Sequence, residues 1–493
     1  MHTQGDTYQH NNSVVDTALE EWKREREFLS KEREIHGELF KQAPCVDDED
    51  TLRSIGIENI FGSRPLGHLK LFPEDFIVEE VSSDGKTHTI DFDRNMNASE
   101  TVSGVCDVRT TWARTVKMGI DTIEVAHQIA RMLNIDRKRI GFAGIKDKYA
   151  LTSQLISIRG VTPDDVRKIS SAGFFLKDIV AGKGTLQTGD LLGNRFTIVV
   201  RTGKPLRDED VYSALHDLEE QGFWNFFYIQ RFGTPRLISH KLGLLILQGK
   251  FEEAVQVSLG YGSGRENLFF KNFRRDLLKY WGNWGAMLKE IEPLSYSLRS
   301  EKKMLLYLYQ RPSDFSGALN QIPDQVRLWV YAYGSYLFNK TLSRLIQSGS
   351  DVPFELPLAL SGSLRAQEFY GDFFKAHHIM PPFHTLKEFP YVQKAEKDVH
   401  TLKKFTLYNY KIIDEGVVID FFLDKAAYAT TLLSHIFMLS SGQPLPDSIS
   451  IKEIDSKCVL GTGTIQPIKE NKFRTLFDLR KEMDIFKNEV SEV

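Results

Sequence analysis

The segment Lys146-Asp147-Lys148 places one carboxylate between two ammonium groups inside an otherwise apolar stretch. The preceding Ala143 and Gly144 are small, so a ligand can approach the backbone closely there. An ionised aspartate in such a loop can act as a nucleophile or as a general base. The same aspartate can instead cap the turn that follows it, which is a structural role. Spacing alone leaves both interpretations open.

A second segment, residues 224–233, places aromatic side chains beside amide and guanidinium groups. An RNA base that has left its stack is held by an aromatic face, and hydrogen bonds read its edge. Asn225, Phe227, Gln230 and Arg231 supply groups of both kinds. A buried strand with inward-facing rings explains the same composition, so this segment also has two interpretations.

Four motifs that follow one another along the chain connect these segments. They read P-E-D-F-x-V-x-E, A-G-x-K-D-x-x-A-x-T-x-Q, G-N-x-F and N-x-F-x-x-Q-R-F-G. The matching residues are Pro73, Glu74, Asp75, Phe76, Val78, Glu80; Ala143, Gly144, Lys146, Asp147, Ala150, Thr152, Gln154; Gly193, Asn194, Phe196; Asn225, Phe227, Gln230, Arg231, Phe232 and Gly233. Together they resemble the TruD family of RNA pseudouridine synthases over roughly residues 60–445, with weaker similarity at 337–339 and 428–430. The N-terminal segment and residues 326–330 are similar to the eukaryotic branch of that family, the pseudouridine synthase 7 branch.

The resemblance implies which residues form the site. Asp147 matches the catalytic aspartate of the family, and Lys70 matches a lysine close to it. Phe76, Asn225 and Phe227 match residues that line the uridine pocket. The implied activity is isomerisation of uridine to pseudouridine in RNA, with tRNA as the expected substrate and small nuclear or messenger RNA as further ones. The reaction has no redox or group-transfer step, so neither a cofactor nor a metal is expected.

One departure from the family pattern concerns the pocket. Bacterial members usually carry glycine directly after the aromatic Phe227, whereas this chain has Tyr228. We expect its phenol ring either to narrow the rim of the pocket or to touch the RNA.

The catalytic carboxylate must be ionised to act. A pocket that excludes water disfavours the ionised form, and a nearby cation favours it. We therefore expect Lys70 and Asp147 to lie within ion-pair distance. Lys146, Lys148 and Arg231, and also Arg236, are expected to contact RNA phosphates.

Two other classes of function remain to be weighed. A catalytically silent RNA-binding protein or RNA chaperone on the same scaffold is the alternative, and the presence of Asp147 and Lys70 argues against it. A metal-dependent nuclease requires acidic or histidine clusters, which the four motifs lack. Residues 182–185 do not form a GxxxxGK[ST] phosphate loop and are expected to be a plain turn.

Several elements must position these residues. Residues 76–81, 155–158, 196–200 and 417–422 have the composition of strands. Asp121 begins a helix with its apolar face at Ile123, Ala126, Ala130 and Leu133, and Val326, Val330, Tyr333 and Leu337 form the buried face of another. An α+β fold is expected, and the resemblance implies a mixed, largely antiparallel sheet. The expected domains are an N-terminal extension (1–59), a discontinuous catalytic domain (60–243 and 405–493) and a mainly helical insertion (244–404).

Composition agrees with a globular protein of two or three domains, since 41% of its 493 residues are apolar and 26% are charged. Residues 1–60 carry 14 acidic and 7 basic side chains, which leaves the remainder net basic. A charged helix at residues 16–41, with a broken apolar stripe (Ala18, Trp22, Phe28, Leu29, Phe40), is expected to be a solvated extension. A second charged helix is expected at 475–490. No membrane segment or secretory signal is predicted, so we expect a soluble monomer in the nucleus or the cytoplasm.

Overall fold

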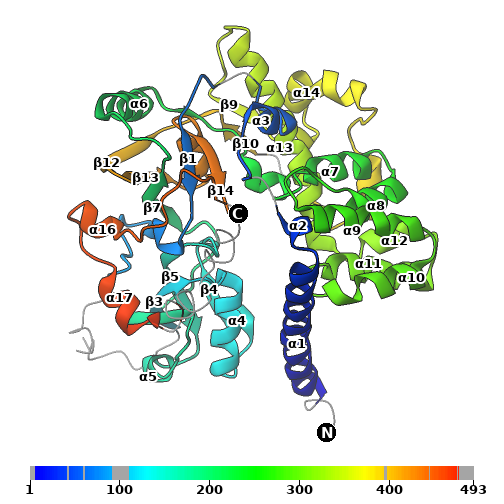
Figure 1. The fold of residues 1–493 in the computed structure, drawn as a ribbon, viewed down its shortest axis with the longest axis horizontal. Coiled ribbons are helices and arrows are strands. Elements are labelled where there is room, and N and C mark those ends of the chain that lie inside the picture. The colour runs from blue at the N-terminus through cyan, green and yellow to red at the C-terminus, as the bar shows by residue number, and fades with distance from the viewer. Residues whose placement is uncertain are drawn as a thin grey trace. The chain divides into compact units, whose positions relative to one another are not determined.

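A computed structural model describes residues 6–41, 44–58, 61–91, 110–393, 397–442, 445–474 and 476, with the backbone alone at 6–19 and 22. The chain forms two compact units (Figure 1). Unit 1 comprises residues 1–62 and 226–401, and unit 2 comprises 63–225 and 402–493. The helix expected at 475–490 and the side chains of Ala18 and Trp22 lie outside the described residues.

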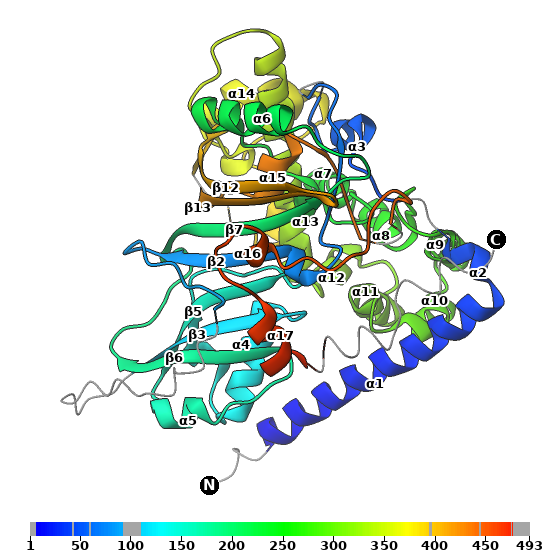
Figure 2. The same cartoon turned by 60° about the vertical axis from the view of Figure 1, so that its left-hand side comes forward.

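Unit 2 is built on a mixed sheet with the strand order β12-β13-β7-β2-β5-β3-β6, which Figure 2 shows from top to bottom. β4 pairs with β5, and β1 pairs with β14 and β7. Only the β2–β5 and β1–β14 pairings are parallel among the described strands, so the predicted largely antiparallel sheet is confirmed. The strands are β1 (Leu66–Leu69), β2 (Phe76–Ser82), β3 (Thr110–Met118), β4 (Ile140–Phe142), β5 (Leu151–Arg159), β6 (Phe174–Gly182), β7 (Leu191–Arg201), β12 (Phe405–Ile413), β13 (Gly416–Asp424) and β14 (Met438–Ser441). A separate two-stranded sheet joins β8 (Phe223–Trp224) and β11 (Leu402–Lys403).

Helices cover both faces of this sheet because alternate strand residues point to opposite sides. The helices of unit 2 are α4 (Thr122–Met132), α5 (Pro163–Arg167), α6 (Asp208–Gln221), α15 (Ala429–Ser434), α16 (Ser456–Val459) and α17 (Gln466–Asn471). α4 packs on Ile156 and Ile158, and the segment of α17 packs on Ile77 and Val116. Asp121 caps α4 as predicted, with Oδ1 accepting the Glu124 N–H at 2.8 Å.

One detail of the predicted face of α4 is wrong. Ile123 is exposed, and Val125 and Ile129 are buried in its place, together with the predicted Ala126 and Ala130. The buried face runs through Thr122, Val125, Ala126, Ile129 and Ala130, so it is rotated away from Ile123. The first turn already meets β5, because Thr122 Oγ1 donates to Gln154 Oε1 at 2.9 Å.

Unit 1 is mainly helical, and its core surrounds the 25-residue α13. Its elements are α1 (Asp6–Ile35), α2 (Gly37–Phe40), α3 (Glu49–Ser54), α7 (Ser239–Leu247), α8 (Phe251–Gly260), α9 (Leu268–Leu277), α10 (Trp284–Ile291), α11 (Arg299–Gln310), α12 (Phe315–Leu319), α13 (Pro323–Gln347), α14 (Leu364–Ala376), β9 (Glu355–Pro357) and β10 (Asp398–His400). The predicted buried face of α13 is confirmed, because its four residues are at most 1% exposed.

The expected solvated N-terminal extension is only partly correct: most described side chains between residues 20 and 41 are exposed, but Glu25 is buried. Glu25 of α1 is 5% exposed, and its Oε2 accepts the backbone N–H groups of Tyr296 and Ser297 at 3.0 and 2.9 Å. These amides precede α11, where a helix N-terminus favours a negative charge. α1 therefore lies against the start of α11, where Lys302 also pairs with Glu21 at 3.3 Å (Figure 2). No helix in the described ranges is long and apolar enough to cross a membrane.

Candidate functional site

The loop that carries Asp147 connects β4 to β5 and is held by side-chain hydrogen bonds to its backbone. Thr122 Oγ1, at the start of α4, accepts the Lys146 N–H at 2.9 Å and donates to Gln154 Oε1 at 2.9 Å. Gln154 Nε2 donates to the Gly144 carbonyl at 3.0 Å. The glutamine of the A-G-x-K-D motif therefore fixes the path of the loop.

Lys146 extends this anchoring into the sheet. Its Nζ lies 2.7 Å from Glu80 Oε2 on β2 and donates to Asn194 Oδ1 on β7 at 2.7 Å. The Lys146 and Glu80 side chains are only 5% and 1% exposed. The prediction that Lys146 contacts an RNA phosphate is wrong, because its ammonium group is enclosed by these partners. Three motifs that are separate in sequence meet at this ion pair.

Asp147 uses its two carboxylate oxygens differently. Oδ1 accepts the Tyr149 N–H at 3.1 Å, and Oδ2 forms an ion pair with Lys70 Nζ. The predicted proximity of Lys70 and Asp147 is confirmed. The Asp147 side chain is 40% exposed, so one side of the carboxylate remains accessible to a substrate.

Lys70 is held in place by the ring of Phe76 and by the turn that follows it. Its φ of 59° lies in the left-handed region, and its Nζ stands 4.4 Å from the centre of the Phe76 ring. Phe76 is 4% exposed and meets Phe196 edge to face at 6.1 Å. The ring therefore supports the ammonium group by a cation–π contact.

The aspartate of the P-E-D motif, Asp75, has a structural role beside Lys70. Asp75 accepts two hydrogen bonds from Arg201, Nε to Oδ2 at 2.8 Å and Nη2 to Oδ1 at 2.9 Å, and both side chains are fully buried. Burial raises the pKa of Asp75, and the arginine opposes this. Asp75 Oδ2 also accepts the Phe72 N–H at 3.2 Å, which fixes the turn after Lys70.

Sequence reasoning missed Lys117, a residue of the central strand β3. Its side chain is fully buried, and its Nζ donates to the backbone carbonyl of Asp147 at 2.6 Å. Burial lowers the pKa of Lys117 to about 8, and the Asp147 carboxylate opposes the shift. No sequence feature pointed to it, because Arg114 and Lys117 interrupt the apolar pattern of β3 and that strand was not predicted.

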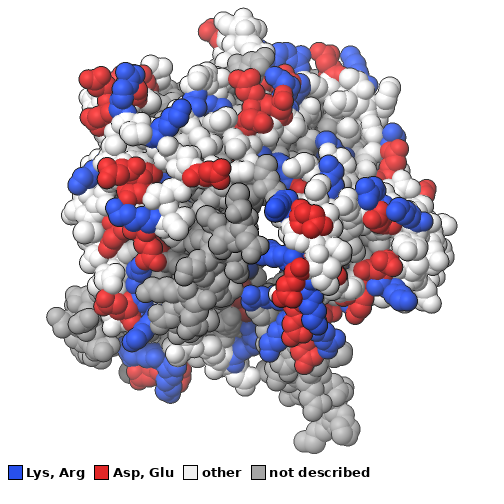
Figure 3. All heavy atoms as spheres, viewed as in Figure 1, with Lys and Arg blue, Asp and Glu red and all other residues white. Residues whose placement is uncertain are grey.

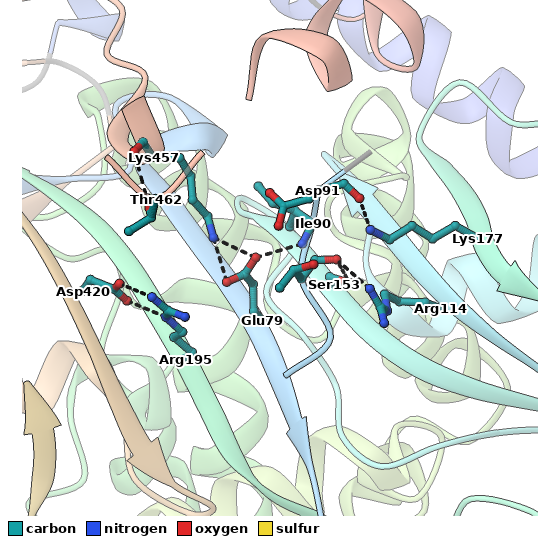
Figure 4. Close-up of polar contacts among 11 residues, drawn as sticks. Glu79, Ile90, Asp91, Arg114, Ser153, Lys177, Arg195, Asp420, Lys457 and Thr462 are labelled. Carbon is teal, nitrogen blue, oxygen red and sulfur yellow. Dashed lines mark hydrogen bonds and ion pairs between the residues drawn. The ribbon is translucent and has the colours of Figure 1, made fainter. Parts of the chain in front are cut away.

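A different charged network occupies the opposite side of the sheet (Figure 4). Glu79, the neighbour of Glu80 on β2, accepts two hydrogen bonds from Lys457 at 2.9 Å and one from the Ile90 N–H at 2.8 Å. Arg195 donates through Nε to Asp420 at 2.9 Å. Because adjacent strand residues point to opposite faces, Glu80 serves the Asp147 loop and Glu79 anchors the segment of α16.

The aromatic motif crosses the boundary between the two units. Asn225 ends the unit 2 segment; it is 5% exposed and follows Trp224, whose N–H donates to His435 Nε2 at 3.1 Å. Burial lowers the pKa of His435 to about 4, so its neutral ring acts as the acceptor. Phe227, Gln230 and Arg231 belong to unit 1.

Within unit 1, the backbone of Phe227 is clamped by Asn339 of α13. Asn339 Oδ1 accepts the Phe227 N–H at 2.9 Å, and its Nδ2 donates to the Phe227 carbonyl at 2.8 Å. Phe338 meets the Phe227 ring edge to face at 5.3 Å, and the Arg231 guanidinium lies 5.6 Å from the ring centre. Arg231 also donates to Ser335 Oγ at 3.0 Å. The weak sequence similarity at 337–339 thus marks a side chain that positions Phe227.

The remaining predicted contacts divide into exposed and enclosed side chains. Lys148 and Gln230 are exposed, so a role in RNA binding stays a prediction for both. Arg236 instead donates to the Ser258 carbonyl at 2.8 Å and lies 3.8 Å from Glu301, and burial lowers its pKa to about 10. The expected phosphate contact of Arg236 is therefore wrong.

Tyr228 is also wrongly placed by the sequence prediction. It is 3% exposed and lies beside Asp47, a carboxylate that Arg265 Nη2 contacts at 2.8 Å. Its ring packs inside unit 1 with the N-terminal segment and neither narrows a pocket rim nor faces RNA.

Potential metal ligands do not gather in the part of the chain that the structure describes. Among the described residues, no group of three or more His, Cys, Asp or Glu side chains is arranged to hold a metal ion.

Comparisons with known proteins agree with the four motifs. The family description "tRNA pseudouridine synthase D (TruD)" matches residues 61–357, more than half of the chain. The "Probable tRNA pseudouridine synthase D" of Archaeoglobus fulgidus is 35% identical over 300 residues, 60% of this chain and 67% of that protein. Its counterpart in Thermococcus sibiricus is 30% identical over 428 residues, 75% of this chain and 94% of that one. The crystal structure of the "Putative tRNA pseudouridine synthase D (TruD)" from Methanosarcina mazei has a similar fold, with a TM-score of 0.59. The match covers 78% of this chain and 97% of that one, at 24% sequence identity. Motif order, fold and similarity over most of the chain thus agree that the protein belongs to the TruD family of tRNA pseudouridine synthases.

Proposed function

We propose that this chain isomerises uridine to pseudouridine in tRNA, with Asp147 as the catalytic carboxylate. The observation that carries the assignment is the Lys70–Asp147 ion pair, on a loop whose backbone is fixed by Thr122 and Gln154. The reaction breaks the N1–C1′ bond of uridine, turns the base and joins C5 to C1′. A partly exposed carboxylate that an ion pair holds in position can reach the substrate as a nucleophile or a base.

The other site residues follow from this assignment. Lys70 positions the Asp147 carboxylate through their ion pair, and Phe76 supports Lys70 and lines the uridine pocket. Asn225 and Phe227 hold the flipped base. Lys148, Gln230 and Arg231 contact the RNA around it. The division into a catalytic domain (60–243 and 405–493) and an insertion (244–404) stays a prediction, since the two compact units divide at 225/226 and 401/402.

The test is tritium release from a tRNA transcript labelled at uridine C5, because forming the C5–C1′ bond expels that hydrogen. The wild-type chain should release tritium, and Asp147→Asn, which keeps the shape but removes the charge, should not. Release by both proteins would exclude Asp147 as the catalytic group. Tight tRNA binding without release by either would favour the silent RNA-binding protein.

We also propose that the chain belongs to the eukaryotic branch, acts as a monomer and resides in the nucleus or the cytoplasm. The N-terminal segment that precedes the family match at residue 61 is the feature on which the branch assignment rests. Labelled small nuclear and messenger RNA in the same assay test the wider substrate range. Sedimentation equilibrium tests the monomer, and a fluorescent fusion tests the location.

A further inference from the structure

A cavity of about 280 Å³ lies in unit 2 outside the Asp147 loop. Its lining is rich in hydrogen-bond donors contributed by the turn before β4, the end of β5 and the turn between β6 and β7. These donors are Arg137, Lys138, Arg139, Arg159, Thr185 and Gln187.

The positive charge of this cavity is not balanced by carboxylates. Burial alone lowers the pKa of Arg137, and no acidic group opposes the shift. Two acidic residues lie near in sequence and accept backbone N–H groups at 2.7 Å, Asp136 from Lys138 and Asp190 from Gln187. Within the described ranges, none of the four cations forms an ion pair with a carboxylate. Four like charges around one cavity repel each other, and a bound anion would relieve that repulsion.

Two of the arginines form a rigid frame. Arg137 Nη1 donates to the Ile140 carbonyl at 2.9 Å, and its guanidinium lies 5.1 Å from the centre of the Phe142 ring. Arg139 donates to the carbonyls of Arg159 and Gly160, both at 2.8 Å. These bonds hold the two guanidinium groups at the cavity without neutralising them.

The other two cations are available to a ligand. Lys138 and Arg159 are exposed. In the described part of the chain their side chains make no hydrogen bond. An arginine presents a planar fork of donors that suits the oxygens of a phosphate, and a lysine supplies a mobile point charge.

The cavity lies close to the proposed catalytic aspartate along the chain. β4 ends at Phe142, which lines the cavity and precedes Asp147 by five residues. Five residues span at most about 18 Å. A single RNA strand can therefore occupy both places.

We propose that this cavity binds a backbone phosphate of the substrate RNA, at a nucleotide away from the target uridine. The inference rests on the proposed action of the chain on tRNA. It adds a second contact that holds the RNA in register with Asp147, and it explains why uncompensated cations gather beside β4.

The test uses the double variant Lys138→Ala/Arg159→Ala and a tRNA transcript, with binding measured from 50 to 200 mM KCl. We expect binding at 100 mM to weaken by about 5- to 20-fold, and the slope of log K against log salt to become shallower by about 1 for each cation removed. In tritium release, the change should fall mainly on KM. Lys204→Ala removes one charge from another exposed position of unit 2 and is the matched control. Arg159→Lys keeps the charge and should recover part of the affinity.

Unchanged affinity and salt slope in the double variant, or changes no larger than those of Lys204→Ala, would overturn the proposal. If the double variant has a lower thermal midpoint, the binding comparison is made with the single variant Lys138→Gln. The Lys138 side chain is exposed and makes no hydrogen bond in the described part of the chain, so its replacement should not destabilise the fold. Absence of tritium release by the wild type would overturn the proposed function and leave this binding measurement readable.

Discussion

At the residue scale, Asp147 makes the turn-capping contact that its spacing allowed, while its catalytic role stays a proposal. One oxygen caps the turn at Tyr149, and the other pairs with Lys70. Lys70 adopts a left-handed backbone conformation, which costs an L-residue about 1–2 kcal/mol. The Asp75 carboxylate fixes the next turn by accepting the Phe72 N–H at 3.2 Å. The position of the ammonium group is thus maintained by structure rather than by local preference.

Replacing Lys70 with glutamine should lower turnover by about 10- to 100-fold, equivalent to roughly 1.4–2.8 kcal/mol in the barrier. The carboxylate loses the ammonium group that holds it in position, so the loss should fall on the chemical step. Stability should change by about 1 kcal/mol or less because the pair is partly open to water. Single-turnover tritium release is the measurement. Lys70→Arg, which restores the charge, should recover part of the rate, and an unaltered rate in Lys70→Gln would remove Lys70 from the site.

Phe227→Ala should also reduce turnover, by about 10- to 100-fold, because stacking of a base on an aromatic ring contributes roughly 1–3 kcal/mol. Phe227→Tyr keeps the ring and is the control, for which we expect a much smaller effect. Steady-state tritium release compares the two variants. Equal activity in both would argue that the ring does not stack on the target base.

At the element scale, α13 connects two distant segments of unit 1. Its fully buried Asn339 binds both backbone groups of Phe227 and also donates to the Ile55 carbonyl at 2.9 Å. Ser343, one turn further, donates to the Gly56 carbonyl at 3.1 Å. One face of a single helix therefore fixes the aromatic segment and the N-terminal segment together.

Asn339→Ala should lower the free energy of unfolding by about 2–4 kcal/mol, because it leaves buried backbone groups without hydrogen bonds. Urea unfolding measures the change, and turnover should fall as Phe227 loses its position. The control is Asn320→Ala, in which a half-buried amide loses its bonds to the Ser316 and Glu388 carbonyls; we expect about 1 kcal/mol or less. Similar losses of unfolding free energy in the two variants would show that the Asn339 hydrogen bonds to Phe227 stabilise the fold no more than those of a half-buried amide.

At the scale of the whole molecule, both units bury neutral histidines, while acidic and basic side chains are interspersed over the surface in view (Figure 3). Burial lowers the pKa of His68 and His88 to about 4, and that of His240 to about 3. A histidine in the unfolded chain titrates near ~6.5. Between these values the unfolded chain takes up protons that the folded protein does not.

Stability should therefore be fully present above about pH 6.5 and should decrease as the pH falls towards 4, by about 1–2 kcal/mol per histidine at pH 5. Thermal unfolding at pH 7 and pH 5 measures this dependence. His68→Gln, which removes a titrating group, should reduce the difference between the unfolding midpoints at pH 7 and at pH 5. His127 is exposed, so His127→Gln serves as the control and should leave the difference between the two midpoints as in the wild type. A pH-independent midpoint in the wild type would contradict the argument.

The sequence by itself determined the features that depend on neighbouring residues: the strands 76–81, 155–158 and 196–200, the cap of α4, the buried face of α13 and the loop that contains Asp147. Alternation, apolar spacing and capping act over a few residues, so they can be read along the chain. The strand β3 was missed because Arg114 and Lys117 interrupt its apolar pattern. The order of motifs was enough to identify the family.

Only the tertiary structure decided which charges face the site and which support it. Lys146 and Arg236 look like phosphate-binding side chains in sequence, yet they are enclosed by Glu80 and by Glu301. Lys117 reaches the carbonyl of Asp147 from a strand 30 residues earlier, and Glu25 reaches the start of α11 across 271 residues. The physical reason is that a charge is exposed or paired according to what the strand order and the helix packing bring beside it, and those partners lie far beyond the range of any local pattern.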